Sequence, residues 1–313
     1  MITAIEQLMA EDTAGDPMST RKWTRRTTAK IARELRRLRI CVSRRTVGRL
    51  LHGLDYSLRV NRKQLGSNAS PDRDRQFRYI ARQRRSFQRH GDPIISVDAK
   101  KRELVGNFKN PGARWDRTPA LVKDHDFRSE STGIAIPYGV YDLAANRGFV
   151  QIGVSHDTPA FAVRAIATWW RTEGHARYAA RRRLLILADT GGSNGYRCSA
   201  WKTELQRQLC DRFGIAVTVA HYPTGASKWN PIEHRLFSEI SKQWAGEPLT
   251  SYEKILRLLR QTRTATGLTV RAILTHTIFP TKVKAAAGPS AQLALKVHRV
   301  LPNWNYTIRP QTA

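Results

Sequence analysis

The fold is decided by one stretch, Arg183-Leu184-Leu185-Ile186-Leu187-Ala188-Asp189, which is followed by Thr190-Gly191-Gly192-Ser193-Asn194-Gly195. An unbroken apolar run of this length, closed by glycines, predicts a strand buried on both faces. The run ends in a carboxylate, Asp189, at the exit of the strand, where open α/β sheets build their functional sites. The alternative is a simple turn, in which Asp189 caps the next segment and the glycines make the bend.

Two further stretches favour a site over a turn. Ile94-Ile95-Ser96-Val97-Asp98 is a short β-branched strand that also ends in a carboxylate. Asn230-Pro231-Ile232-Glu233 opens a predicted helix, to about residue 245, with an acidic residue near its start. We therefore predict that Asp98, Asp189 and Glu233 form one metal-binding cluster, here called the carboxylate triad.

The order of the predicted elements indicates the fold class. From residue 94 they run strand, strand, strand, helix, strand, helix, strand, helix, with strands at 94–98, 136–142, 148–154, 183–189 and 215–220. A hairpin meander followed by alternating helices and strands gives an α/β fold: a mixed five-stranded sheet flanked by helices, the ribonuclease-H-like arrangement. If the first and fourth strands are neighbours, Asp98 and Asp189 lie side by side, and the last helix brings Glu233 to the same end.

Crowded carboxylates of this kind have a definite chemistry. They repel one another and raise one another's pKa values, which a hard divalent cation relieves. Oxygen-only ligands favour Mg²⁺ or Mn²⁺, and two such ions ~3.5–4 Å apart can activate a nucleophile and stabilise the leaving oxygen of a phosphodiester. Alternatives remain open: Asp98 is a strand-end ion pair, or Glu233 closes a capping box with Asn230. The rival acidic residues are Asp142, Asp157 and Asp126.

The charge of the chain indicates its partner. The 313 residues include 54 Lys and Arg against 25 Asp and Glu, a formal net charge of +29, and residues 21–90 alone hold 22 Lys and Arg and 4 Asp and Glu. Like charges at this density repel without a counter-charge, so we predict a polyanion, double-stranded DNA ahead of an anionic membrane. No segment reaches the ~18 apolar residues of a membrane span. The N-terminus does not resemble a signal peptide.

The cysteines and the charge together suggest a location. Cys41, Cys198 and Cys210 are odd in number and follow neither a disulfide nor a zinc pattern. They indicate reduced thiols in a cytoplasmic protein, here one associated with the nucleoid.

Four segments are predicted: a poorly ordered lead-in (1–20), a helix-turn-helix module (21–65), a connector helix (66–92) and a catalytic domain with a C-terminal helix and tail (93–313). In the module, Ile31, Leu35 and Leu38 fall on one face of a first helix capped by Thr27 or Thr28. Ser43 caps a second helix, with Val47, Leu50 and Leu51 inward and Gly53 at its end. The outer face of that recognition helix then carries Arg44, Arg45 and Arg49, and residues 56–60 form a wing strand.

Each of these assignments has an alternative. An ordinary amphipathic helix pair would show the same pattern as a helix-turn-helix. In the connector, Phe77, Ile80, Arg84 and Phe87 recur at alternating steps of three and four, which suits either a connector or a dimer contact. We favour the connector, because one position of the seam is an arginine.

Several motifs resemble those of a known family. Residues 222–233 (Tyr-Pro-Thr-Gly-Ala-Ser-Lys-Trp-Asn-Pro-Ile-Glu) resemble the last catalytic motif of DDE transposases. Residues 96–110, 137–146, 188–195 (Ala-Asp-Thr-Gly-Gly-Ser-Asn-Gly) and 304–310 (Trp-Asn-Tyr-Thr-Ile-Arg-Pro) look more closely like the ISAzo-type insertion-sequence transposases. The resemblance covers about residues 20–310.

This resemblance implies a transposase. Asp98, Asp189 and Glu233 would take the three metal-binding roles, with two Mg²⁺ or Mn²⁺ ions, and cut and join DNA. The N-terminal region would bind the terminal repeats of the transposon, and Lys100, Lys101 and Lys228 are expected to contact terminal-repeat and target DNA. We expect a homodimer or higher oligomer on DNA. The alternative is a DNA-binding regulator, or a truncated remnant, whose catalytic domain is only a scaffold.

Overall fold

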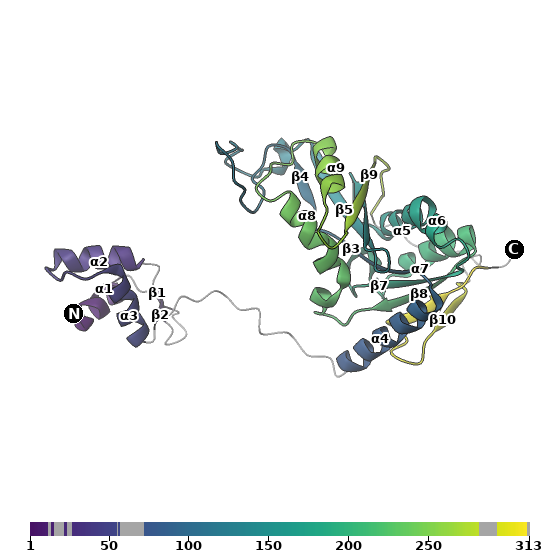
Figure 1. The fold of residues 1–313 in the computed structure, drawn as a ribbon, viewed down its shortest axis with the longest axis horizontal. Helices are drawn as coiled ribbons and strands as arrows, with labels where there is room; N and C mark the ends of the chain where they lie inside the picture. The colour runs from purple at the N-terminus through teal and green to yellow at the C-terminus, as the bar shows by residue number, and fades with distance from the viewer. Residues whose placement is uncertain are drawn as a thin grey trace. The chain divides into compact units, whose positions relative to one another are not determined.

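The structure, a computed structural model, describes residues 1–11, 14–15, 22–23, 27–54, 56, 72–281 and 293–311. The chain divides into two compact units, residues 1–66 and residues 67–313 (Figure 1). Each unit has a hydrophobic core of its own. In the described ranges, no helix is both long enough and apolar enough to cross a membrane.

The described residues of the first unit form three helices and a short strand pair. They are α1 (Ile2–Glu11), β1 (Ala14–Gly15), β2 (Lys22–Trp23), α2 (Thr28–Arg37) and α3 (Arg44–Gly53). The predicted caps are present: the Thr27 hydroxyl accepts the Lys30 amide at 3.2 Å, and the Ser43 hydroxyl accepts the Thr46 amide at 3.1 Å. One residue of α1, two of α2 and one of α3 form the fully buried core: Ile5, Ile31, Leu35 and Val47.

Two predictions for this unit are wrong. The first half of the expected lead-in is the helix α1, which supplies Ile5 to the core. Leu38 follows the end of α2 and is 55% exposed, so it is not a core position. Residues 57–60 of the expected wing lie outside the described residues. The helix-turn-helix assignment stays a prediction.

The second unit is built on a mixed sheet whose five central strands have the predicted ribonuclease-H-like order. They are β6 (Arg147–Gly153), β5 (Gly133–Asp142), β3 (Ile94–Ala99), β7 (Arg183–Ala188) and β8 (Ala216–His221). β5 is antiparallel to both of its neighbours, while β7 and β8 run parallel to β3. The sequence-based fold class is therefore confirmed.

The sheet is larger than predicted: the described residues contribute nine strands to it instead of five. β9 (Thr269–Thr275) adds in parallel to β6, and β11 (Asn305–Ile308) adds antiparallel to β8. β10 (Leu295–Val297) pairs with β11, and β4 (Glu103–Val105) pairs with β5. Both outer edges of the predicted sheet are thus covered by later segments of the chain.

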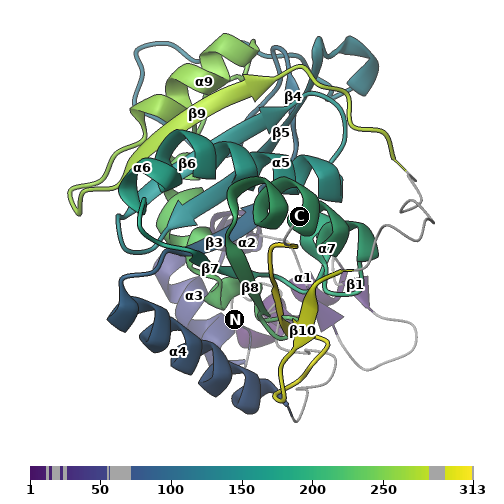
Figure 2. The same ribbon diagram turned by 90° about the vertical axis from the view of Figure 1, so that its right-hand side faces the viewer.

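Helices pack on both faces of the sheet. One face carries α5 (Pro159–Trp169), its continuation η2 (Trp170–Gly174) and α6 (His175–Arg177), and α7 (Ser199–Leu205) with η4 (Gln206–Asp211) (Figure 2). The other face carries η6 (Glu233–Phe237), α8 (Ser238–Gln243) and α9 (Tyr252–Gln261). Single 3₁₀ turns lie in the loops: η1 (Arg128–Glu130), η3 (Gly192–Asn194) and η5 (Ser227–Trp229).

The helix α4 (Arg73–His90) packs against β3 and β7 on the same face as η6. Ile80 and Phe87, from the predicted seam, are buried in a cluster with Ile94 of β3 and Leu185 of β7. The apolar seam residues of α4 therefore contact their own chain, which favours a connector over a dimer contact.

Candidate active site

Asp98 lies near the end of β3, at the centre of the sheet, opposite Gly139 of β5. The glycine is required by packing. A Cβ at position 139 would come within 2.6 Å of Phe237 Cε1 and 2.8 Å of Ile232 Cδ1. The absence of a side chain there lets the segment that carries Glu233 pack directly against the strand beside Asp98.

Asp189 and Glu233 approach from the two elements next to Asp98. β7 is parallel to β3, with Ala188 in register with Val97, so Asp98 and Asp189 each follow a register-paired residue. Glu233 is the first residue of η6, a π-helical turn, a geometry often found at functional sites. The predicted juxtaposition of the three carboxylates thus follows from strand register and the packing of η6.

The three carboxyl groups affect one another's pKa values. The pKa of Asp98 is raised to about 8, first by burial and then by the charges of Asp189, Glu233 and Asp157, while a hydrogen bond from the Ala99 amide at 2.8 Å lowers it. Burial also raises the pKa of Asp189 and of Glu233, and Asp189 adds to the shift at Glu233. In the part of the chain that the structure describes, none of the three forms an ion pair with a basic side chain.

A chain of buried polar groups joins the segments that carry the triad. Asn230 Nδ2 donates to Asp189 Oδ1 at 3.0 Å, and Asn230 Oδ1 accepts from the Ser96 hydroxyl. The Ser96 hydroxyl oxygen in turn accepts from the Ile232 amide at 3.0 Å. Ser96 and Asn230 are fully buried. Asp189 therefore takes part in this series of hydrogen bonds, and Asp98 and Glu233 each lie within two residues of a group that does.

These contacts exclude the alternative in which Glu233 closes a capping box with Asn230. Its side chain does not cap the helix, because both amide atoms are engaged by the sheet, and the Ser96 hydroxyl meets the Ile232 amide instead. Glu233 does not close a capping box either, since the Asn230 amide donates to the Ser227 carbonyl at 2.8 Å. The Glu233 carboxylate is thus not used as a cap.

A second buried chain, which sequence reasoning missed, holds the end of β7. His221 Nδ1 lies 2.8 Å from the Asp189 carbonyl, and His221 Nε2 lies 3.3 Å from the Tyr306 hydroxyl. Burial lowers the pKa of His221 to about 4, so the ring is neutral and Nδ1 donates to the carbonyl. The Trp201 indole donates to the Tyr306 hydroxyl at 3.0 Å. The only available signal was the position of His221 at the end of a predicted strand.

The rival acidic residues separate by position. Asp142 is completely buried at the other end of the sheet, where it accepts from the Tyr178 hydroxyl at 2.9 Å and from Arg177 at 3.1 Å. Asp126 is exposed on the loop between β4 and β5. Asp157 is near enough to raise the pKa of Asp98, and burial raises its own pKa. Of the three rivals, only Asp157 belongs to the neighbourhood of the triad.

The donor chemistry of the triad fits a hard divalent cation, because all its ligating atoms are carboxylate oxygens without a basic partner. As the side chains lie, no three His, Cys, Asp or Glu residues among those described are arranged to hold a metal ion. The triad therefore fits a divalent cation in the type and charge of its donor atoms.

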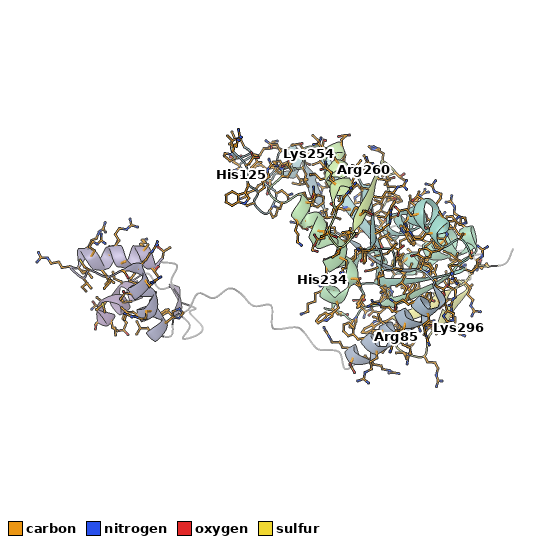
Figure 3. All side chains as sticks on the ribbon, in the orientation of Figure 1. Arg85, His125, His234, Lys254, Arg260 and Lys296 are labelled. Atoms are coloured by element: carbon orange, nitrogen blue, oxygen red, sulfur yellow. The ribbon has the colours of Figure 1, made fainter. Side chains whose placement is uncertain are left out.

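Basic side chains line a pocket of about 530 Å³ beside Glu233. Lys101 and Lys228 are exposed there, and His234, labelled in Figure 3, follows Glu233 in the chain. Lys100 is less accessible: its ammonium lies 3.5 Å from Glu103 and 4.8 Å from the centre of the Trp244 ring, and its side chain is 13% exposed. In the first unit, the predicted DNA-binding residues Arg44, Arg45 and Arg49 are all exposed.

The chain is similar in sequence to one protein family and more distantly similar to solved structures. The model of a family described as "Rhodopirellula transposase DDE domain" matches residues 4–310. A Mos1 transposase paired-end complex with the left transposon end is 16% identical, with a TM-score of 0.46 over 83% of this chain and 69% of that chain. A pre-cleavage Mos1 transpososome is 14% identical, with a TM-score of 0.45 over 83% and 70%. No curated protein matches the chain.

Proposed function

This chain belongs to the family of Rhodopirellula transposase DDE domains, and from that premise we propose that it binds transposon ends and catalyses metal-dependent DNA cleavage and strand transfer. The observation that carries the proposal is the electrostatics of the triad. Asp98, Asp189 and Glu233 are half-buried, the charge of Asp189 raises the pKa values of the other two, and none of the three forms an ion pair among the described residues. Structural acids are normally paired when buried, whereas strongly perturbed unpaired groups are typical of functional sites.

The residues of the triad would hold two Mg²⁺ or Mn²⁺ ions. The chemistry that such ions supply when bound is activation of the attacking oxygen and stabilisation of the leaving oxygen in an in-line displacement at phosphorus. Asn230 keeps one oxygen of Asp189 engaged at 3.0 Å and so limits how that carboxylate can turn. Attack by water on a phosphodiester frees a 3′-OH, and attack by that 3′-OH on target DNA gives strand transfer.

The DNA would be held by basic residues in both units. Lys101 and Lys228 line the pocket beside Glu233, which suits the phosphate backbone on either side of the reacting bond. Arg44, Arg45 and Arg49 lie on the exposed side of α3, and we propose that α3 reads the transposon end in the major groove. Work on DNA implies a place at the nucleoid in the cytoplasm, and pairing of two ends implies a dimer or higher oligomer.

Incubation with the ends of the element itself and Mg²⁺ tests the proposal. We expect cleavage that leaves a 3′-OH. We also expect end binding that weakens with salt, with each neutralised phosphate adding about −0.9 to the slope of log K against log salt. The second candidate, a DNA-binding regulator or inactive remnant, predicts end binding without cleavage in Mg²⁺ or Mn²⁺. Binding that is insensitive to salt would contradict both candidates.

A further inference from the structure

We propose that the outer face of α4 is a binding surface for the phosphates of duplex DNA. Five exposed arginines share this face, and we call them the arginine stripe: Arg75, Arg78, Arg82, Arg85 and Arg89. Their steps along the chain alternate between three and four residues, which keeps the side chains on one side of a helix. The inference rests on the proposed function and deepens it, since none of the DNA contacts proposed above lies on α4.

The opposite face of α4 is fixed to the second unit, so the stripe has a fixed place beside the sheet. Tyr79, Ile80 and Phe87 are buried there. The Gln76 amide forms a reciprocal pair with Asn305 of β11: Gln76 Nε2 donates to Asn305 Oδ1 at 2.8 Å, and Asn305 Nδ2 donates to Gln76 Oε1 at 2.7 Å. Figure 1 shows α4 along one side of the unit, and Figure 3 labels Arg85 on it.

The positive charge of the stripe is largely unopposed within the protein. Arg78 pairs with Asp74 at 2.6 Å and Arg75 lies 3.9 Å from Asp72, but all four side chains are at least 44% exposed, so water screens both pairs. Among the described residues, no carboxylate lies within ion-pair distance of Arg82, Arg85 or Arg89. Like charges three and four residues apart destabilise a helix. A polyanion on this face would remove that repulsion.

The alternative explanations fit the stripe less well. A merely solvated helix face normally mixes charges of both signs, whereas this one places five arginines against two acids at the start of the helix, Asp72 and Asp74. A helix that lies on a membrane needs a free apolar face to insert, and the apolar face of α4 is occupied by its own unit. The partner that remains for the arginine stripe is a polyanion with regularly spaced charges.

Duplex DNA fits the length and the place of the stripe. From Arg75 to Arg89 the helix rises about 21 Å, and a duplex carries a phosphate charge about every 1.7 Å of its axis. In chain order, α4 follows the proposed DNA-reading helix α3 and leads, through Gly91, into the strand that carries Asp98. We infer that α4 holds duplex DNA on the same unit that carries the carboxylate triad.

Charge-neutral variants of the full chain test this inference. The triple variant Arg82→Gln, Arg85→Gln and Arg89→Gln keeps helix propensity and removes the three arginines that have no carboxylate partner. Binding to end DNA and to random DNA is measured as a function of salt. If each arginine neutralises one phosphate, the salt slope should fall by roughly 2.7 for both DNAs, with the preference for the end sequence unchanged.

Two further variants make the test specific. The matched control is Arg164→Gln, Arg171→Gln and Arg212→Gln, which removes the same charge from exposed positions on other helices; its slope should change much less. Asp74→Asn removes the acid from the stripe and should tighten DNA binding. Equal losses in the two triple variants, an unchanged slope in the stripe variant, or weaker binding by Asp74→Asn would overturn the proposal. Weaker binding of the stripe variant to anionic vesicles, with DNA binding unchanged, would overturn it in favour of a membrane.

Failure of this inference and failure of the proposed function give different results. If the wild-type chain neither binds DNA in a salt-dependent way nor cleaves it, the proposed function fails. If the wild-type chain binds and cleaves its ends while the stripe variant keeps the wild-type slope, only the role of α4 fails.

Discussion

Buried or half-buried carboxylates lie at both ends of the central strands. They have basic ion-pair partners at one end and none at the other. At one end, Asp92 pairs with Arg183, and Asp142 accepts from Arg177 and Tyr178. At the other end, the carboxylate triad has no basic partner among the described residues. Burial is therefore common to both ends, and the missing counter-charge is what distinguishes the proposed active site.

The largest effect is expected from Glu233→Gln. The substitution keeps size and helix propensity but removes one negative charge from the unpaired end. DNA cleavage in Mg²⁺ should collapse, while end binding and thermal stability persist, as assayed on end DNA and by thermal melting. Glu239→Gln, which breaks an ion pair with Lys242 in the following helix, is the matched control and should cleave normally. Normal cleavage by Glu233→Gln would remove Glu233 from the site and make Asp157 the next candidate.

A smaller loss is expected when the polar chain behind the triad is cut. Asn230→Asp keeps an acceptor for the Ser96 hydroxyl, but loses the donor to Asp189 and adds a charge. Substitution of residues that orient metal ligands typically costs about 10–100-fold in metal affinity or activity. We expect such a loss in cleavage, with a raised Mg²⁺ requirement in a titration. Asn230→Ala should lose less, since it adds no charge. If the loss of cleavage were no larger than the loss of folded protein, Asn230 would have only a structural role.

At the paired end, Asp142→Asn should act on stability and not on chemistry. Breaking a buried ion pair leaves an uncompensated charge and costs about 3 kcal/mol, which urea unfolding would measure. The folded variant should cleave DNA at the wild-type rate below its melting temperature. Asp98→Asn is the counterpart at the unpaired end: it should abolish cleavage and leave the metal-free protein as stable as before or more so. If Asp142→Asn lost cleavage without losing stability, the contrast between the two ends would be wrong.

The smallest effect is a pH dependence of the metal-free protein. The pKa of Asp98 is raised from 3.8 to about 8 in the folded chain, so the folded state keeps a proton that the unfolded state has lost. The stability from this proton is fully present below pH 3.8 and is lost as pH rises to about 8. The melting temperature should therefore fall between pH 5 and pH 8, less steeply in Asp98→Asn. Added Mg²⁺ should stabilise the wild type more at pH 8 than at pH 5. Identical pH profiles for the two proteins would contradict the shift.

Much of the second unit could be predicted because its signals are local. The run at 183–188 and the strand at 94–99 are short, apolar and bounded, and their order defines the five central strands. Strand register then brings Asp98 beside Asp189. The outer strands were missed because β9 and β11 owe their place to partners far away in the chain. β11 is also only four residues long.

The residues whose roles were predicted wrongly or missed have a related explanation. Asn230 has the composition and position of a helix cap, but the sheet offers its amide stronger partners in Asp189 and Ser96. His221 and Tyr306 meet only when β11 pairs with β8, so no local spacing could join them. α1 has weak helix signals and is completed by the burial of Ile5. Tertiary partners, which a local pattern does not contain, decided each of these cases.

The reciprocal amide pair between Gln76 and Asn305 also has a consequence for the time at which the protein becomes active. Its two members are 229 positions apart in the chain, an interval that takes a ribosome on the order of 10–50 s. From the synthesis of β8 until the synthesis of β11, the edge of β8 is unpaired and His221 lacks the hydroxyl of Tyr306. Residues 1–66 have their own core and are synthesised first. We therefore expect the growing chain to be able to hold DNA before it can cut it.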